Sequence, residues 1–170
     1  QIKFPQNLKS IGEGTFHGCK KLESAIVPDS TTQIGRWAFR SCTGLKSVVF
    51  PSTVEQMGDG VFLDCSSLKD VTLPENLENI GSSYFSGCES LEKVTLSANI
   101  TSIGNYAFRN CIKLTHVDLP RVLTTIGESA FLSCQSLELM AFPVTVTQVE
   151  NDAFKDAGLK DLYYEGTESD

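Results

Sequence analysis

The chain repeats itself every 23 residues, and this period limits its fold more than any other feature of the sequence. Seven of its ten phenylalanines stand 23 residues apart, at Phe16, Phe39, Phe62, Phe85, Phe108, Phe131 and Phe154. Glycine keeps the same spacing from Gly12 to Gly127, and leucine does so from Leu22 to Leu137. A unit of this length buries too little surface to be stable alone, so the units must stack on one another as a solenoid.

Each unit has the local pattern of a short strand followed by two bends. In the unit that starts at Leu45, Val48 and Phe50 recur at period two, which predicts a short strand with one face turned inward. Pro51 then ends the strand, because proline has no N–H to donate. Glycine at the phase of Gly58 predicts either a positive φ or a close approach between backbones.

These patterns predict a right-handed parallel solenoid with one sheet of short strands on its inner face and little long helix. Phenylalanine and cysteine three residues apart, as at Phe108 and Cys111, predict a single helical or 3₁₀ turn on the outer side of each unit. Equivalent side chains of successive turns would form columns through the core.

The repeat resembles a known family. The pattern Leu-x-x-Val-x-Leu-Pro-x-x-Leu-x-x-Ile-Gly-x-x-x-Phe-x-x-Cys, which runs from Leu68 to Cys88 and again from Leu114 to Cys134, is similar to the BspA-like, treponemal-type leucine-rich repeat. The resemblance covers almost the whole chain. It implies a bacterial protein that is extracellular, at the cell surface or secreted, and that acts as an adhesin or a protein-binding module.

The repeats are expected to fill residues 1–149, with an incomplete first repeat and no N-terminal cap, and residues 150–170 are expected to form the terminal repeat and C-terminal cap. In the last turn Glu150 replaces glycine, Ala157 replaces cysteine and Leu159 comes one residue early. An uncapped first strand offers unpaired backbone groups, which predicts end-to-end self-association.

Six cysteines follow the same period and are predicted to be free thiols that pack as small apolar side chains. Equivalent Cβ atoms in adjacent turns would be separated by about the inter-turn spacing, which exceeds the ~3.8 Å of a relaxed disulfide. These residues form a predicted core column beside the phenylalanines: Cys19, Cys42, Cys65, Cys88, Cys111 and Cys134.

The sequence predicts no catalytic, metal-binding or cofactor-binding residue, and therefore no cofactor and no enzyme. It has no C-x-x-C pair, and its two histidines, His17 and His116, are far apart. A net charge of -7 argues against a nucleic-acid partner. The longest apolar stretches are far shorter than the roughly 20 residues that cross a bilayer, so no membrane insertion is expected.

Recognition is predicted on the outward positions of the inner strands, where residue identity varies from turn to turn. One column of candidates consists of Ile26, Val49, Thr72, Thr95, Asp118, Ala141 and Tyr163. Lys93, His116 and Leu139 lie in the column beside it. Apolar residues at both ends favour protein contacts, although ordinary β-propensity also explains them. Trp37 and Tyr106 on the outer side are further aromatic candidates.

Two functions are compatible with this sequence. The first is a non-enzymatic surface module that binds a protein ligand, either a host matrix or surface protein or another bacterial surface protein, through the inner sheet face. The alternative is a structural spacer that displays another domain and has no ligand of its own.

Overall fold

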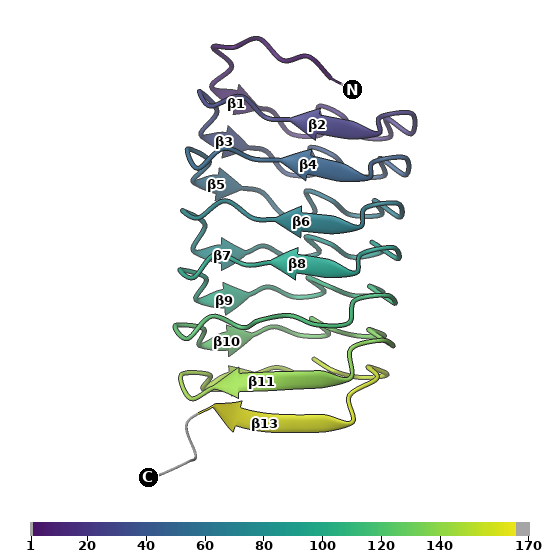
Figure 1. The fold of residues 1–170 in the computed structure, drawn as a ribbon, viewed down its shortest axis with the longest axis vertical. Coiled ribbons are helices and arrows are strands. Elements are labelled where there is room, and N and C mark those ends of the chain that lie inside the picture. Colours follow the sequence, from purple (N-terminus) through teal and green to yellow (C-terminus); the bar gives the residue numbers. More distant parts are fainter. Residues whose placement is uncertain (1, 166–170) are drawn as a thin grey trace.

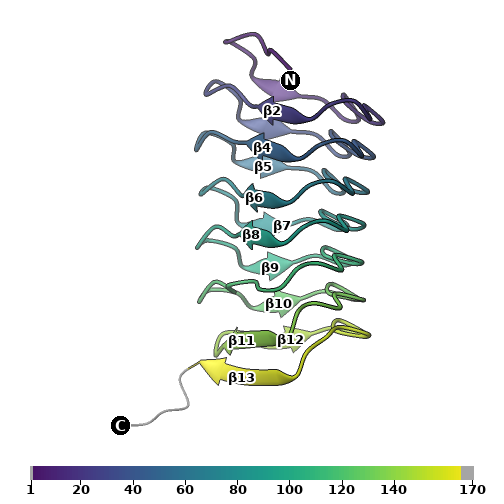
Figure 2. The same cartoon turned by 45° about the vertical axis from the view of Figure 1, so that its right-hand side comes forward.

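The chain coils as a right-handed solenoid in which each turn lies on the one before (Figures 1 and 2). This computed structural model describes residues 2–165. Within that part of the chain every regular element is a β-strand and none is a helix. The predicted parallel solenoid is therefore confirmed.

The strands that the sequence predicted form one side of the solenoid, here called the front sheet. Neighbours pair in parallel and advance by one repeat, since Ala25 pairs with Val48 and Val71 with Val94. In the last pair the step is one residue shorter, because Leu139 pairs with Asp161, and this agrees with the early position of Leu159. The front sheet comprises β2 (Ser24–Ile26), β4 (Ser47–Val49), β6 (Asp70–Thr72), β8 (Lys93–Thr95), β11 (Leu139–Pro143) and β13 (Asp161–Glu165).

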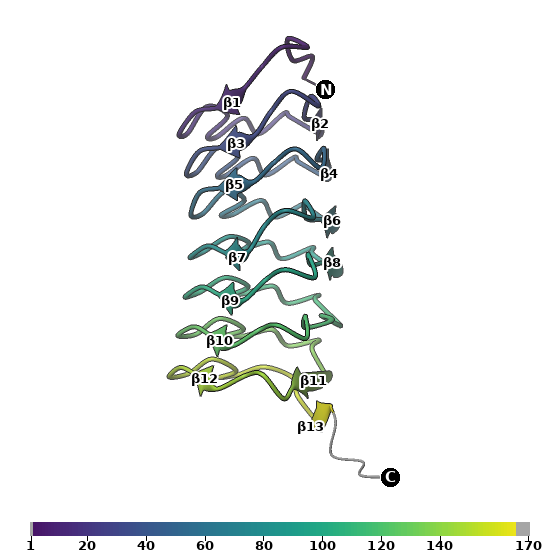
Figure 3. The ribbon, with the colours of Figure 1, turned by 90° about the vertical axis from the view of Figure 1, so that its left-hand side faces the viewer.

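A second set of strands, each two residues long, forms another side of the solenoid, here called the side sheet (Figure 3). The sequence predicted only one sheet. Stacking brings the same short segment of every turn into parallel register, so a second ladder forms. The side sheet comprises β1 (Ser10–Ile11), β3 (Gln33–Ile34), β5 (Gln56–Met57), β7 (Asn79–Ile80), β9 (Ser102–Ile103), β10 (Thr125–Ile126) and β12 (Gln148–Val149).

The third side consists of hydrogen-bonded turns, where the sequence predicted a helical or 3₁₀ turn. Some N–H groups bond three residues back, as from Cys111 to Phe108 at 3.1 Å. Others bond to the next turn of the solenoid, as from Phe108 to Ala130 at 2.7 Å and from Asn110 to Leu132 at 2.8 Å. A helix would use these N–H groups internally, so the outer turns replace helical bonds with bonds between repeats.

Two positions in each outer turn have a positive φ, which reverses the chain and turns N–H groups toward the next repeat. The first position holds Gly14, Trp37, Gly60, Ser83, Tyr106, Ser129 and Asp152. The second holds Gly18, Ser41, Asp64, Gly87, Asn110, Ser133 and Asp156. The left-handed region costs roughly 1–2 kcal/mol for a residue with a Cβ, so stacking must offset this cost in most turns.

The periodic glycine at the end of each side strand serves close packing between backbones. None of the glycines at the phase of Gly58 has a positive φ. A Cβ on Gly58 would lie 2.4 Å from the backbone nitrogen of Arg36 in the preceding turn. Of the two roles that the sequence allowed, close approach is the one observed.

Phenylalanine forms a continuous stack through the core. The rings of Phe62 and Phe85 lie 5.5 Å apart with an interplanar angle of 10°, and those of Phe108 and Phe131 lie 5.0 Å apart with an angle of 9°. Both ring spacings are close to the distance between successive turns. The stacking of the turns therefore places the rings at a favourable contact distance.

The cysteine column lies beside this stack, and its residues are free thiols. The Sγ of Cys65 donates to the carbonyl oxygen of Phe39 at 3.0 Å, and that of Cys111 donates to Phe85 at 3.1 Å. The thiol therefore fills space as a small apolar group and also satisfies a buried carbonyl of the preceding repeat. Cys19, in the first turn, is exposed.

Both sheets are interrupted between the same two turns, at a place here called the seam. β4 does not pair with β6, and β5 does not pair with β7. Every Cα of β5 lies more than 8 Å from every Cα of β7, whereas the other neighbouring strands of the side sheet approach within that distance. The wider gap between β5 and β7 is visible in Figure 3.

We predict that Phe85→Ala lowers the free energy of unfolding by about 3–5 kcal/mol, because it opens a cavity in the middle of the stack. Phe85 has no exposed surface and contacts the rings of Phe62 and Phe108. Urea unfolding followed by circular dichroism measures the change, with exposed Thr72→Ala as the control. A Phe85→Ala protein that unfolds at the wild-type midpoint would refute this role.

We predict that Ser83→Gly stabilises the protein by about 1 kcal/mol, because Ser83 has a φ of 55° that glycine adopts without a Cβ penalty. Ser82→Gly is the matched control: its φ is not positive, so glycine there should destabilise by about 0.5–1 kcal/mol. Thermal unfolding of both variants measures the two changes in stability. Equal shifts of the melting temperature in the same direction would contradict the prediction.

Candidate functional site

The outward residues of the front sheet lie side by side at its N-terminal end. Ile26 pairs with Val49 across β2 and β4. Their side chains are 54% and 55% exposed, which makes them two of the most exposed large apolar residues among those described. Together they form an apolar pair on a rigid surface.

The centre of the front sheet is polar and carries both signs of charge. Thr72 pairs with Thr95, and Asp70 pairs with Lys93, on β6 and β8. The next turn forms only an isolated bridge between Lys93 and His116. His116 is exposed, and its Nε2 lies 2.7 Å from Oδ1 of Asp118.

The C-terminal end of the front sheet carries a second, smaller apolar group. Leu139 is 40% exposed and Ala141 is half-buried, both on β11. Ala141 pairs through the backbone with Tyr163, whose side chain lies outside the described residues. The polar centre separates this group from Ile26 and Val49, so the described outward residues of the front sheet do not form one uniform patch.

Two hollows lie over the seam, and the sequence predicted neither. The smaller, of about 590 Å³, is on the front sheet, where Val49, Thr72 and Pro74 contribute to its wall. The larger, of about 1030 Å³, is on the side sheet. Its lining extends from Ser10 and Gln33 to Gln56 and Asn79, so only part of this hollow lies over the seam. The repeat pattern carried no signal for them, because the 23-residue period continues unchanged across the seam.

The described residues carry little of the chemistry of an active site. No group of three or more His, Cys, Asp or Glu side chains among them is placed to hold a metal ion. Burial raises the pKa of Cys42 to about 11 and that of Cys134 to about 12, and it raises those of Cys88 and Cys111 well above the ordinary value. These thiols stay protonated and are poor nucleophiles. No helix long and apolar enough to span a bilayer occurs within the described chain.

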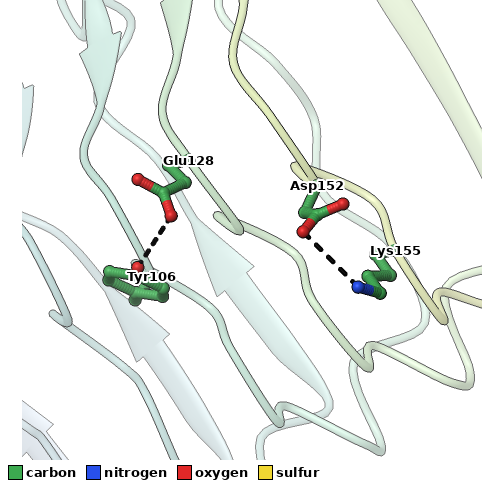
Figure 4. A network of polar contacts seen from close by, with 4 residues as sticks. All are labelled: Tyr106, Glu128, Asp152 and Lys155. Atoms are coloured by element: carbon green, nitrogen blue, oxygen red, sulfur yellow. Dashed lines mark hydrogen bonds and ion pairs between the residues drawn. The ribbon is translucent and has the colours of Figure 1, made fainter.

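The aromatic residues of the outer side contact their own chain. Oη of Tyr106 donates to Oε1 of Glu128 in the next turn at 2.9 Å, close to an ion pair between Asp152 and Lys155 (Figure 4). Trp37 covers Gly60, where a Cβ would lie 2.6 Å from its Cδ1. These contacts favour a stabilising role for both rings.

The family model of the BspA type leucine-rich repeat region matches the chain in six copies, over residues 1–111 and 64–169. The chain belongs to this family. A leucine-rich repeat protein from Bacteroides ovatus is 29% identical, with a TM-score of 0.84 over 96% of this chain. The leucine-rich repeat protein of T. pallidum is 26% identical, with a TM-score of 0.71 over 92% of this chain. This chain covers 48% of the length of the Bacteroides ovatus protein and 66% of the length of the T. pallidum protein.

A leucine-rich cell surface protein from Faecalibacterium prausnitzii shares the fold at 19% identity, with a TM-score of 0.54 over 92% of this chain and 63% of its own. No curated protein matches the chain with significance. The family expected from the repeat pattern is confirmed.

We predict that one of the six thiols reacts rapidly with Ellman's reagent in the native protein at neutral pH. Cys19 is exposed, whereas the five other cysteines are buried, and burial raises the pKa of each. The absorbance released by the native protein is compared with that in denaturing urea, where six thiols should react. Rapid reaction of several thiols in the native protein would contradict the packing of the column.

Proposed function

We propose that this chain is a non-enzymatic binding module of a bacterial surface protein, and that it engages a protein ligand through the outward residues of the front sheet. The observation that carries the proposal is the exposed pair Ile26 and Val49, held in register on a rigid sheet. Membership of the BspA-type family supports it. An adhesin that contacts a host matrix protein, a host surface protein or another bacterial surface protein fits this surface.

The front sheet has the chemical arrangement of a protein interface. Apolar side chains that are already ordered by a sheet lose little entropy on binding, so they can anchor a partner. Asp70 and Lys93, on the two strands that follow the seam, provide charges of both signs for selecting the partner. Leu139 and Ala141 offer a second anchor at the far end.

We predict that Ile26→Ser with Val49→Ser reduces capture of protein ligands at least about 10-fold, since anchor residues typically carry 1–4 kcal/mol each. Immobilised wild type and variant are incubated with purified matrix proteins and with bacterial surface extracts, and the bound proteins are quantified. The control is Val122→Ser with Val149→Ser, which removes two valines that are 45% and 48% exposed away from the front sheet.

Equal capture by the wild type and the front-sheet variant would reject this face as the binding site. If neither captures any protein, the spacer function is favoured, in which the module only displays another domain.

A further inference from the structure

The seam breaks a bonding pattern that otherwise recurs between all neighbouring turns on the side sheet. One recurring bond runs from the N–H of Thr101 to the carbonyl of Glu78 at 2.8 Å, and the other from Gly104 to Ile80 at 2.8 Å. Across the seam, the equivalent bonds would join Glu78 to Glu55 and Gly81 to Met57. Neither forms, and these four backbone groups have no hydrogen-bond partner among the described residues.

The solenoid remains closed on its outer side at the same place. The N–H groups of Gly60, Phe62 and Asp64 bond to the next turn at 2.8, 3.0 and 2.8 Å. The phenylalanine stack also continues there, from Phe62 to Phe85. At one end of the gap, Nδ2 of Asn76 donates to the carbonyl of Ser52 at 2.8 Å, and at the other end the N–H of Ser82 donates to Oδ1 of Asp59 at 2.9 Å. The seam is therefore an opening on the side sheet that is limited to β5 and β7.

Tyr84 accounts for the separation from inside. Its ring is fully buried at a position where the other turns carry Thr15, Ala38, Val61, Ala107, Ala130 and Ala153. The ring lies against Gly81, where a Cβ would be 3.2 Å from Cδ2 of the tyrosine. Its hydroxyl is buried without a hydrogen-bond partner. An oversized side chain in a close-packed interior displaces its surroundings, and we infer that this ring holds the two turns apart.

Two glutamates account for the separation from outside. Glu55 and Glu78 are exposed and stand at equivalent positions on the two sides of the seam. The other turns carry Lys9, Thr32, Thr101, Thr124 and Thr147 at this position. In a closed ladder the two carboxylates would face each other directly, which destabilises strand pairing. An acidic pair therefore occurs only where the sheet is open.

The opening has the width and the chemistry for one additional strand. Strands in a sheet lie about 4.8 Å apart, so a gap that holds one more strand measures about 9.6 Å. The separation of more than 8 Å between β5 and β7 is compatible with this width. Unpaired donors line one edge, at Glu78 and Gly81, and unpaired acceptors line the other, at Glu55 and Met57. An extended backbone offers both kinds of group to both edges.

We propose that the seam binds an extended segment of a partner protein, which inserts as an extra parallel strand between β5 and β7. A lysine or arginine of that segment lies between Glu55 and Glu78 and replaces their repulsion with two attractive contacts. Its inward side chains are apolar, because Met57 and Leu77 line the hollow. This site is separate from the front sheet, so it stands whether or not the front sheet binds a partner.

The chain itself contains a segment with this pattern and supplies the probe. In residues 6–13, Lys9 stands at the same position of the repeat as Glu55 and Glu78. Leu8 and Ile11 stand at the positions of the repeat that face inward. Within the molecule this segment already pairs with β3, so the occupant is a segment of another protein. The probe is a fluorescent synthetic peptide of residues 6–13, with a Lys9→Glu peptide and a backbone N-methylated peptide as controls.

Fluorescence anisotropy measures peptide binding to the full chain. We expect Glu55→Gln with Glu78→Gln to weaken binding at least about 10-fold. Glu89→Gln with Glu92→Gln, which removes the same charge from exposed positions elsewhere, should leave binding unchanged. The Lys9→Glu and N-methylated peptides should not bind. Equal binding to both double variants, binding of the N-methylated peptide, or absence of binding by the unmodified peptide would overturn the proposal.

Hydrogen exchange locates the bound peptide independently of affinity. The amides of Glu78 and Gly81 should exchange rapidly in the free protein and become protected when the peptide binds. The amides of Thr101 and Gly104 are already bonded and serve as controls. Peptide binding that leaves Glu78 and Gly81 unprotected would refute insertion at the seam, as would protection of these amides by a neutral polysaccharide and not by the peptide.

Spin labels test whether the seam is open. With Cys19→Ser as the background, labels at positions 55 and 78 should show weaker dipolar broadening than labels at 101 and 124, which have the same phase in adjacent, paired turns. Tyr84→Ala should make the two pairs alike and weaken peptide binding. Equal broadening in the protein that retains Tyr84 would show a closed seam and overturn the proposal.

Discussion

Hydrogen bonds between the outer turns are the constraint on which the rest of this solenoid depends. They require N–H groups that point along the solenoid axis, and the backbone provides these by adopting a positive φ twice in each repeat. The bonds continue even where both sheets are interrupted, from Phe62 to Tyr84. The sheets can therefore vary in length, register and pairing, because the outer side holds the turns in sequence.

Because the outer turns and the core hold the repeats together, the residue identities at the surface of the front sheet can vary. Away from the two ends of the solenoid, the phenylalanine and cysteine side chains are buried, and the thiols donate to backbone carbonyls of the preceding turn, as from Cys65 to Phe39. The outward side chains of the front sheet, such as those of Ile26 and Thr72, are exposed, and these residues pair with the next turn only through the backbone. They can differ from repeat to repeat at little cost in stability, and a binding surface requires that freedom.

The period of the sequence was sufficient to predict the stacking of turns, the strand at Val48 and the core positions of Phe85 and Cys88, because each of these depends on one buried side chain per repeat. It was not sufficient for the outer turns. The first of the two positions with a positive φ holds Trp37 and Ser83 as well as glycine, so its conformation is imposed by inter-turn bonds. The second holds only glycine or a short polar residue, such as Asn110, which is a weak signal for this conformation. The side strands are two residues long, which is too short for an alternating pattern. The seam depends on Tyr84 and on the facing pair of Glu55 and Glu78, whose relation appears only when the columns are aligned.

The unbroken ring stack has a consequence for how the two halves of the molecule communicate. Phe62 and Phe85 stay in parallel contact although the sheets on either side of them have separated. A repeat array with only nearest-neighbour contacts divides into independently melting blocks wherever one interface is weak. Here the aromatic column crosses the weak interface, so we expect the segments before and after it to unfold as a single cooperative unit.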